Sequence, residues 1–327
     1  MPRDGSDAAL TRREFAKANR TTVITMSLPT IALVTPSLNQ GRFIRSAIQS
    51  VLAQEYSGLE YLVMDGGSID DSCEVTSEFE PLLTLIREKD EGQSDAINKG
   101  FSRVSGEIIG WLNADDYYAP GTLEKIATVF AEHPEVGLVY GHAEYVDEVG
   151  QPLGPAAQIE PFDLDRLLTI GNFIVQPSAF FRRSAFEAVG GLRKDLHWSM
   201  DYDLWIRLGK RYRVLHIPET LAYVRCYAGT KTALGGRRRF AEVEQVIRSN
   251  GGSSLPVYFR MEAAMFGARE AMQFVRMHKF RQALGLVGSA VGEVACSPRT
   301  TVALASLRTW RVILAARKRN SRINAGA

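Results

Sequence analysis

Two adjacent carboxylates, Asp115 and Asp116, follow the apolar run IIGWL at the point where a buried strand would end, and Asn113 comes just before them. Such oxygen ligands suit a hard divalent cation, Mg²⁺ or Mn²⁺, which binds one or two carboxylates together with phosphate oxygens. The ion would bridge a diphosphate and offset the charge that develops on the leaving group. The alternative interpretation is a turn, where Asn and Asp are common.

Asp65 is a second candidate, because it ends the apolar run LEYLVMD and is followed by Gly66 and Gly67. An acidic side chain at a strand end can bond a ribose or a base, and glycines let the backbone approach the ligand closely. No GxGxxG follows the first predicted strand, which disfavours a dinucleotide oxidoreductase. A Gly-Gly turn without a ligand is the alternative.

Asp201 and Asp203 lie two residues apart in WSMDYDLWIRLGKR, which has helical spacing. Side chains two apart on a helix diverge by about 200°, so these carboxylates are not expected to share one task. One is then available as a general base that faces a cleft. The other caps the helix or pairs with Arg207, Lys210 or Arg211. A solvated helix face is the alternative.

The apolar pattern predicts the elements that would position these groups. Strands are predicted at 31–36, 59–65, 82–88, 107–112 and 136–147. Helices are predicted at 42–54, at 92–104, at 120–133 with Pro120 near its first turn, and in SIDDSCEVTSEF with Ser68 or Asp70 as N-cap.

This alternation of strands and helices indicates βαβ units and an α/β fold, with a mostly parallel sheet and helices on both faces. Ligands bind such sheets at the carboxyl ends of the strands, where the candidate carboxylates would converge. After residue 150 the pattern is less regular. It predicts a strand and a short helix in 176–192, a helix at 198–211, strands at 212–218 and 220–227, and helices from 236 onward.

Composition excludes several classes of protein. The net charge of +2 over 327 residues provides no strong field for nucleic acid, so no nucleic-acid partner is expected. Three cysteines, far apart in the chain, indicate a reducing compartment without a disulfide framework. The chain contains no run of about 18 apolar residues, so no transmembrane helix is expected.

The two ends of the chain differ from the middle. TRREFAKANR, at 11–20, looks like a twin-arginine export signal, but the weakly apolar segment after it runs into the first predicted strand. We therefore expect residues 1–29 to be a polar, disordered extension, with Met26 as a candidate start. Residues 236–327 are expected to form a helical region with a basic end, because seven basic and no acidic residues follow Glu293. That end is either a solvated face or tail, or a surface for anionic lipid.

Five stretches together resemble the family 2 glycosyltransferases of the GT-A fold, over residues 30 to 232. They are PSLNQGRFIRSAIQSVLAQEYSGLEYLVMDGGSIDDS, EGQSDAINKGFSRVSGEIIGWLNADDYYAPG, QPSAFFRRSAFEAVGGL, MDYDLWIRLGKR and YVRCYAGTKT. The resemblance implies a Rossmann-like GT-A domain at 30–235, a UDP-, GDP- or dTDP-sugar donor, Mn²⁺ or Mg²⁺, and inversion at the anomeric carbon.

The resemblance also implies roles for individual residues. Asp201 would be the general base, Asp115 and Asp116 would hold the metal, and Lys231 and Thr232 would close over the diphosphate. The loop near the sugar and acceptor would contain Gln176, Pro177 and Trp198. The donor would be bound by Pro36, Ser37, Asn39, Asp65, Gly92, Asp95, Asn98, Asn113, Ala114 and Asp115.

Two positions depart from the family pattern. Met200 stands where the family has the first acidic residue of a Glu-Asp pair, so Asp201 lacks its usual partner. Tyr227 stands where many members have a histidine. The second departure bears on how the late loop holds a metal or diphosphate.

The expected function is transfer of a sugar to a carbohydrate or lipid-linked acceptor, in bacterial surface polysaccharide assembly. The expected place is the cytoplasm, including the inner face of the membrane through the basic C-terminus. One alternative is a metal-dependent nucleotidyltransferase, although the loop PSLNQGR is poor for a triphosphate. The other is a non-catalytic nucleotide-sugar-binding member of the same fold, which the departures at Met200 and Tyr227 motivate.

Overall fold

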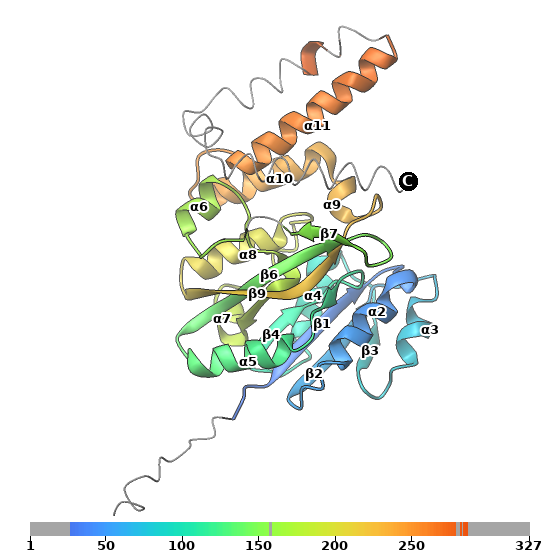
Figure 1. Ribbon diagram of the computed structural model, residues 1–327, viewed down its shortest axis with the longest axis vertical. Coiled ribbons are helices and arrows are strands. Elements are labelled where there is room, and N and C mark those ends of the chain that lie inside the picture. The colour runs from blue at the N-terminus through green and yellow to red at the C-terminus, as the bar shows by residue number, and fades with distance from the viewer. Residues whose placement is uncertain (1–26, 157–158, 279–281, 283, 287–327) are drawn as a thin grey trace, which may run out of the picture.

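The structure is a computed structural model that describes residues 27–156, 159–278, 282 and 284–286. The expectations for residues 1–26 and for the basic residues after Glu293 lie outside the described residues. In the described part, nine strands form one sheet with the order β3-β2-β1-β4-β8-β6-β9-β5, and β7 pairs with β6 (Figure 1). The strands are β1 (Ile31–Ser37), β2 (Leu59–Asp65), β3 (Thr84–Arg87), β4 (Ile108–Trp111), β5 (Tyr117–Tyr118), β6 (Val136–Val146), β7 (Pro152–Pro155), β8 (Ala179–Arg182) and β9 (Arg213–Arg225).

The first half of the sheet is parallel. β1 pairs in parallel with β2 on one side and with β4 on the other, and β2 pairs in parallel with β3. In the second half β6 and β9 are also parallel, whereas β8 lies antiparallel between β4 and β6. The carboxyl ends of β1, β2 and β4 therefore meet at one edge, where the predicted carboxylates follow.

Helices cover both faces of the sheet, as the sequence predicts. Alternate residues of β1 face opposite sides, with Leu33 in the cluster that includes α2 and α5 and Val34 in the cluster that includes α4 and α8. The helices of the sheet domain are α2 (Gly41–Leu52), α3 (Ser72–Ser77), α4 (Gln93–Phe101), α5 (Thr122–Glu132), α6 (Leu164–Thr169), α7 (Arg183–Ala188), α8 (Met200–Gly209) and α9 (Lys231–Leu234), with the 3-10 turn η1 (Gln176–Ser178).

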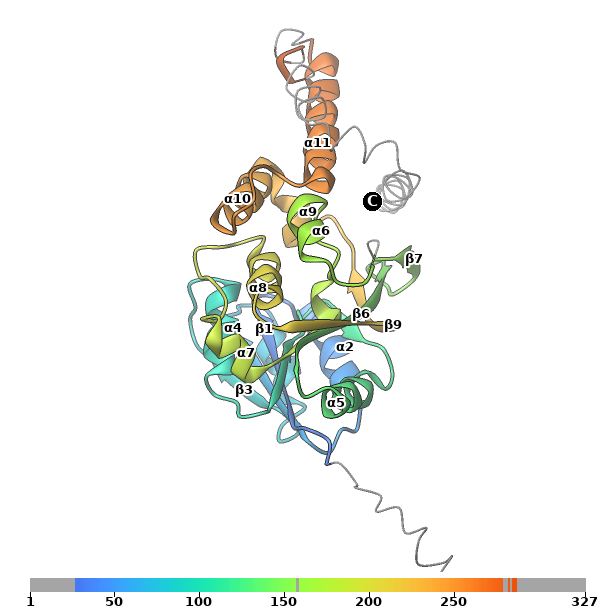
Figure 2. The same cartoon turned by 90° about the vertical axis from the view of Figure 1, so that its left-hand side faces the viewer.

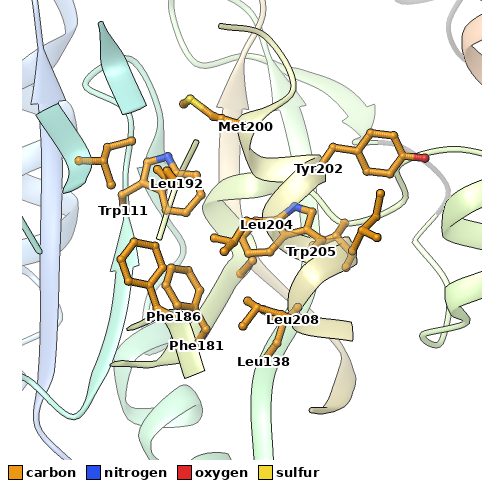
Figure 3. Close-up of a cluster of buried hydrophobic side chains, with 14 of the residues drawn as sticks. Trp111, Leu138, Phe181, Phe186, Leu192, Met200, Tyr202, Leu204, Trp205 and Leu208 are labelled. Carbon is orange, nitrogen blue, oxygen red and sulfur yellow. The ribbon is translucent and has the colours of Figure 1, made fainter. Parts of the chain in front are cut away.

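The core beneath α8 is aromatic. Trp205 of α8 stacks on Trp111 of β4 with ring centroids 5.7 Å apart, and Phe181 of β8 meets both indoles edge-on (Figure 3). All three rings are fully buried. Such aromatic pairs add about 0.5–1.5 kcal/mol beyond their burial. The packing fixes α8 against the end of β4, and thus fixes the position of Asp201 relative to Asn113.

Two long helices follow the sheet domain. α10 (Gly236–Ser249) lies between α8 and α11 (Val257–Arg276) in both views of the ribbon (Figures 1 and 2). Val243, Val246 and Ile247 of α10 are buried in the same cluster as the core of α8. Over the described residues, none of the helices is both long and apolar enough to cross a bilayer.

The structure corrects some of the local predictions. The strands predicted at 212–218 and 220–227 are one strand, β9, which runs through Pro218 beside β6 with shifts in register. The N-cap of α3 is Asp71. Ser68 and Asp70, predicted for that role, instead accept hydrogen bonds from the backbone at Asn39 and Gly41. Short elements without a clear apolar period, β5, β7, α6 and α9, were not predicted from the sequence.

Candidate functional site

Asn113, just beyond the end of β4, is the centre of a polar network. Its Nδ2 donates to Gln176 Oε1 at 3.0 Å and to Asp116 Oδ2 at 3.1 Å, while its Oδ1 accepts from Gln93 Nε2 at 2.7 Å. Gln176 also donates to the carbonyl oxygen of Trp111 at 2.7 Å. The network therefore joins the ends of β4, η1 and α4. Gln93 was not predicted, although it lies in the quoted stretch EGQSDAINKG.

The two adjacent aspartates have different surroundings. Asp116 is buried, and its two carboxylate oxygens accept from the backbone N–H of Arg225 at 3.0 Å and from Asn113. Burial and the neighbouring charge of Asp115 raise the pKa of Asp116 well above its usual range. Asp115 is more exposed, and its Oδ2 accepts from the hydroxyl of Tyr227 at 3.1 Å. The geometry thus favours Asp115 over Asp116 as the carboxylate that meets a ligand.

Arg225, at the end of β9, supports this turn. Its Nη1 donates to the carbonyl oxygen of Asp115, and its guanidinium lies 4.6 Å from the ring centre of Phe43 and 5.4 Å from that of Tyr117. The buried positive charge opposes the effect of burial on the pKa of Asp115, which nevertheless remains raised. Sequence analysis missed Arg225, because the contact spans 110 residues and no local pattern marks it.

Lys231 connects this turn to α8. Its Nζ donates to Gln93 Oε1 at 2.8 Å, and it interacts electrostatically with Asp201. Burial lowers the pKa of Lys231 to about 8, against the opposing charges of Glu242 and Asp201. A cation therefore bonds the Asn113 network and also acts electrostatically on the predicted base.

Asp201 and Asp203, two residues apart on α8, have different surroundings. Burial raises the pKa of Asp201 to about 6, although backbone N–H groups at the start of α8 lower it. Asp203 is buried, accepts from Arg207 Nε at 2.7 Å and lies 3.2 Å from Asn250 Nδ2. Asp203 is therefore a structural anchor, and Asp201 has the pKa of a base that works near neutral pH.

Met200 belongs to the hydrophobic core. It is buried in the aromatic cluster of α8 (Figure 3). The hydroxyl of Ser94 lies 2.8 Å from its sulfur. An acidic side chain here would face Trp111 and its neighbours.

The carboxylate of Asp65 is hydrogen-bonded within the loop that follows β2. Its carboxylate accepts from the backbone N–H of Gly67 and Ser68 at 3.0 and 2.8 Å and from the Ser68 hydroxyl at 2.6 Å. Burial would raise its pKa, but the bonds from Ser68, Cys73 and Gly67 outweigh that effect and lower the pKa. Asn39 closes the same loop by accepting from Ile69 N–H at 2.9 Å. Asp65 therefore shapes the loop. Ser37 lies next to it in the sheet, and its buried hydroxyl has no hydrogen-bond partner among the residues that the structure describes.

The predicted residues of α4 hold a neighbouring loop. Asn98 exchanges two hydrogen bonds with the backbone of Leu192, at 2.8 and 3.0 Å. Asp95 forms ion pairs with Lys194 at 2.6 Å and Lys99 at 3.0 Å, and chiefly the bond from Lys194 lowers its pKa to about 2. Gly92 is the N-cap of α4 with φ of 123°, a conformation that favours glycine.

The other predicted residues line the same end of the sheet. Pro36 pairs with Met64 in the β1–β2 register, Ala114 is buried beside Asn113, and Pro177 is buried in η1. Thr232 is exposed in α9. Trp198 precedes α8, with its indole close to Gly235. The structure thus brings the Asn113 group, Lys231 and Asp201 together, whereas Asp95 and Asn98 face the loop at 192–194.

The oxygen ligands fit a divalent ion that arrives with a diphosphate. Among the residues that the structure describes, no three His, Cys, Asp or Glu side chains gather to form a metal site. Mg²⁺ and Mn²⁺ often use only one or two carboxylates, with phosphate oxygens and water as the other ligands. Asp115, whose Oδ2 accepts from the hydroxyl of Tyr227 and which is partly exposed, would be the carboxylate available to such an ion.

Comparison with known sequences identifies glycosyltransferases as relatives. The pattern of Glycosyl transferase family 2 matches residues 32–190. The chain is similar to a PGL/p-HBAD biosynthesis glycosyltransferase of Mycobacterium tuberculosis, with 31% identity over 187 residues that make up 56% of this chain and 70% of that protein. An uncharacterized glycosyltransferase of Rickettsia prowazekii is 25% identical over 229 residues, which cover 66% of this chain and 70% of that protein.

Comparison with solved structures shows the fold. Residues 1–349 of TarS from S. aureus, in complex with UDP-GlcNAc, align with a TM-score of 0.56 and 15% identity, covering 90% of this chain and 89% of that one. The mannosyltransferase PcManGT from Pyrobaculum calidifontis, in complex with GDP-Man and Mn²⁺, aligns with a TM-score of 0.54 and 20% identity, covering 91% and 87%. The predicted GT-A fold is confirmed.

Proposed function

The chain belongs to glycosyl transferase family 2, and from this premise we propose that it transfers a sugar from a nucleotide-sugar donor to a hydroxyl group with inversion at the anomeric carbon. The proposed acceptor is a carbohydrate or a lipid-linked glycan. The proposed setting is assembly of bacterial surface polysaccharide at the inner face of the cytoplasmic membrane.

One arrangement carries this proposal. Lys231 bonds Gln93, Gln93 bonds Asn113, and the same lysine interacts with Asp201. Lys231 and the side-chain amides can hydrogen-bond a diphosphate. The same lysine interacts with the carboxylate of Asp201, which can accept a proton. Transfer of a sugar from a nucleoside diphosphate needs both functions at adjacent positions.

Asp201 is assigned as the general base. An acceptor hydroxyl attacks poorly while it keeps its proton, and a carboxylate within hydrogen-bond reach can take that proton as attack proceeds. A pKa of about 6 leaves Asp201 mostly ionised at neutral pH and still basic enough to accept the proton. One such base is sufficient for direct displacement, which inverts the anomeric centre.

Lys231 and the Asn113 group are assigned to the leaving nucleoside diphosphate. Lys231 has a pKa of about 8 and is largely protonated at neutral pH, so it can bond a phosphate oxygen from the side of Gln93. When bound, a divalent ion at Asp115 would neutralise charge on the departing diphosphate. Arg225 binds the backbone carbonyl oxygen of Asp115 and donates its own backbone N–H to Asp116, while the hydroxyl of Tyr227 bonds the Asp115 side chain.

A thermal-shift screen tests the donor site. UDP, GDP, CMP and dTDP are each added with and without Mn²⁺ to the wild type and to Asp115→Ala, because a ligand that binds only the folded state raises the unfolding midpoint. We expect an Mn²⁺-dependent rise with one nucleotide that is lost in the variant. If none of the four nucleotides raises the unfolding midpoint, a non-catalytic protein would be favoured. Release of pyrophosphate from a nucleoside triphosphate would favour a nucleotidyltransferase.

A further inference from the structure

Glu242 of α10 holds the segment that leads into α8. Its Oε1 accepts from the backbone N–H of Trp198 at 2.6 Å, from the backbone N–H of Ser199 at 2.7 Å and from the Ser199 hydroxyl at 2.7 Å. Its Oε2 accepts from the backbone N–H of His197 at 2.8 Å. One carboxylate thus binds three consecutive backbone donors immediately before the helix that carries Asp201.

Glu242 differs from the other nearby carboxylate of the same helix. Glu244, two residues along, pairs at the surface with Arg248, four residues further on in α10. The four bonds of Glu242 instead reach about 45 residues back along the chain, from α10 to the start of α8. Figures 1 and 2 show α10 packed beside α8 at this end. The contact therefore joins the first long helix after the sheet domain to the proposed catalytic helix.

The contact has a clear physical effect on the start of α8. The first N–H groups of a helix have no partner within it, and the aligned peptide dipoles make this end positive. Ser199, the N-cap of α8, bonds through its hydroxyl to Glu242, and no side-chain bond of its own caps the helix. Glu242 adds a third carboxylate to this end of the helix, beside Asp201 and Asp203 of the first turn, and it binds the turn before Met200. The direction in which Asp201 leaves the helix depends on that turn.

We propose that Glu242 is a positioning residue for the transfer reaction: by fixing residues 197–199 it orients Asp201, so that the helical region after residue 235 belongs to the catalytic apparatus. This inference rests on the proposed function, in which Asp201 is the base. It assigns to α10 a task beyond packing. Glu242 acts through the backbone it binds, without touching the acceptor.

The charges around Asp201 give this proposal a distinctive signature. Lys231 of α9 and Glu242 of α10 both act on Asp201, Tyr202 is the adjacent titratable group on α8, and His197 in the preceding turn also interacts with Lys231 and Glu242. The charge of Glu242 raises the pKa of Asp201 and also that of Lys231. Removal of that charge should lower both pKa values. The acid and basic limbs of the pH profile of kcat/KM should then both move to lower pH.

Two measurements test the proposal on Glu242→Ala, Glu242→Gln and the control Glu244→Gln. The first is amide hydrogen exchange of residues 197–199, which requires no substrate. We expect exchange there to become about tenfold faster or more in Glu242→Ala, and to stay as in the wild type in Glu244→Gln. Unchanged exchange in Glu242→Ala would overturn the proposed contact.

The second measurement is the pH profile of nucleotide release from UDP-GlcNAc and GDP-Man, each with Mn²⁺ and an acceptor panel. Glutamine keeps an oxygen for Trp198 and Ser199 but carries no charge, so Glu242→Gln should shift both limbs to lower pH. Glu244→Gln should match the wild type. A profile for Glu242→Gln that changes only in height would leave Glu242 a structural residue and contradict the proposal.

The Asp201→Asn variant separates failure of this inference from failure of the proposed function. Full activity of Asp201→Asn would show that the base is wrong, whatever Glu242 does. Loss of activity in Asp201→Asn together with an unshifted profile in Glu242→Gln would reject the role of Glu242 alone. If the wild type releases neither nucleotide, the catalytic role fails with the proposed function, and hydrogen exchange still decides whether Glu242 holds residues 197–199.

Discussion

The amino group of Lys231 lies 2.8 Å from the side-chain oxygen of Gln93, although 138 residues separate the two in the chain. Gln93 in turn bonds Asn113, next to the aspartates that follow β4. The short helix α9 is thereby fixed over the carboxyl end of the parallel strands. Together with the bonds of Arg225 and Tyr227 to Asp115, this contact brings the late part of the fold to the proposed diphosphate site.

Replacement of this lysine should weaken nucleotide binding. Lys231→Met removes a cation placed for a phosphate oxygen, so the dissociation constant for UDP or GDP with Mn²⁺ should rise about tenfold or more. Because its pKa is about 8, wild-type affinity should fall as the pH rises above 8. Titration by calorimetry from pH 7 to 9.5 should show this step in the wild type and none in Lys231→Met. The control Lys125→Met, which loses only a surface pair with Glu219, should behave as the wild type.

Substitution of Asp116 should lower stability, whereas substitution of Asp115 should abolish the response to Mn²⁺. Asp116→Asn leaves one of two buried donors, Arg225 N–H or Asn113 Nδ2, without an acceptor, and should cost about 1–3 kcal/mol in the free energy of unfolding. Asp115→Asn should lose the Mn²⁺-dependent rise in midpoint and change stability little. Urea unfolding and thermal shift measure the two effects. If Asp116→Asn instead loses the Mn²⁺ response and keeps full stability, Asp116 would be the residue that meets the ion and Asp115 the structural one.

The methionine that departs from the family pattern should not be replaceable by an acid. Met200→Leu keeps an apolar side chain of similar volume and should cost less than about 1.5 kcal/mol. Met200→Glu would bury a carboxyl group against Trp111 and should cost more than about 2 kcal/mol. Unfolding by urea compares the two variants. A stable and more active Met200→Glu would show that the pair of acidic residues can be rebuilt here.

Asp95 should make stability depend on pH. Its pKa is lowered to about 2, chiefly by Lys194, from about 3.9 in an unfolded chain, so its contribution is complete above pH 4 and is lost as the pH falls toward 2. Lys194 is about half exposed, so solvent screening limits the contribution to about 1 kcal/mol. Asp95→Asn should therefore be less stable than the wild type at pH 7, with the gap closing in acid. A gap that stays constant down to the acid transition would refute the ion pair.

The parallel half of the fold could be predicted from the sequence because its signals are local. β2 spans residues 59–65 as predicted, since LEYLVMD is an apolar run stopped by two glycines. The helix predicted at 42–54 is observed as α2 at Gly41–Leu52, because its apolar residues recur at helical spacing. The edge strands β5 and β7 have two and four residues, which is too short for a period to show.

The site could be predicted by residue type but not by partner. The sequence placed Asp115 and Asp201 at the ends of elements. It could not show that Ser68 and Gly67 occupy the oxygens of Asp65, or that Asn98 binds Leu192. Gln93, Arg225 and Glu242 were missed for one physical reason: each acts through a contact with residues far away in the chain. Only the folded arrangement of the sheet brings those partners together.

The most direct test of the central claim is the transfer activity of Asp201→Asn beside its nucleotide binding. The variant keeps the shape of Asp201 but cannot take a proton, so UDP or GDP release from the sugar donor in the presence of acceptor should fall at least about a hundredfold. The Mn²⁺-dependent rise in midpoint with the same nucleotide should remain within a degree or so of the wild-type value. Near-normal turnover in Asp201→Asn would contradict the account, because the carboxylate at the start of α8 would then not be the base.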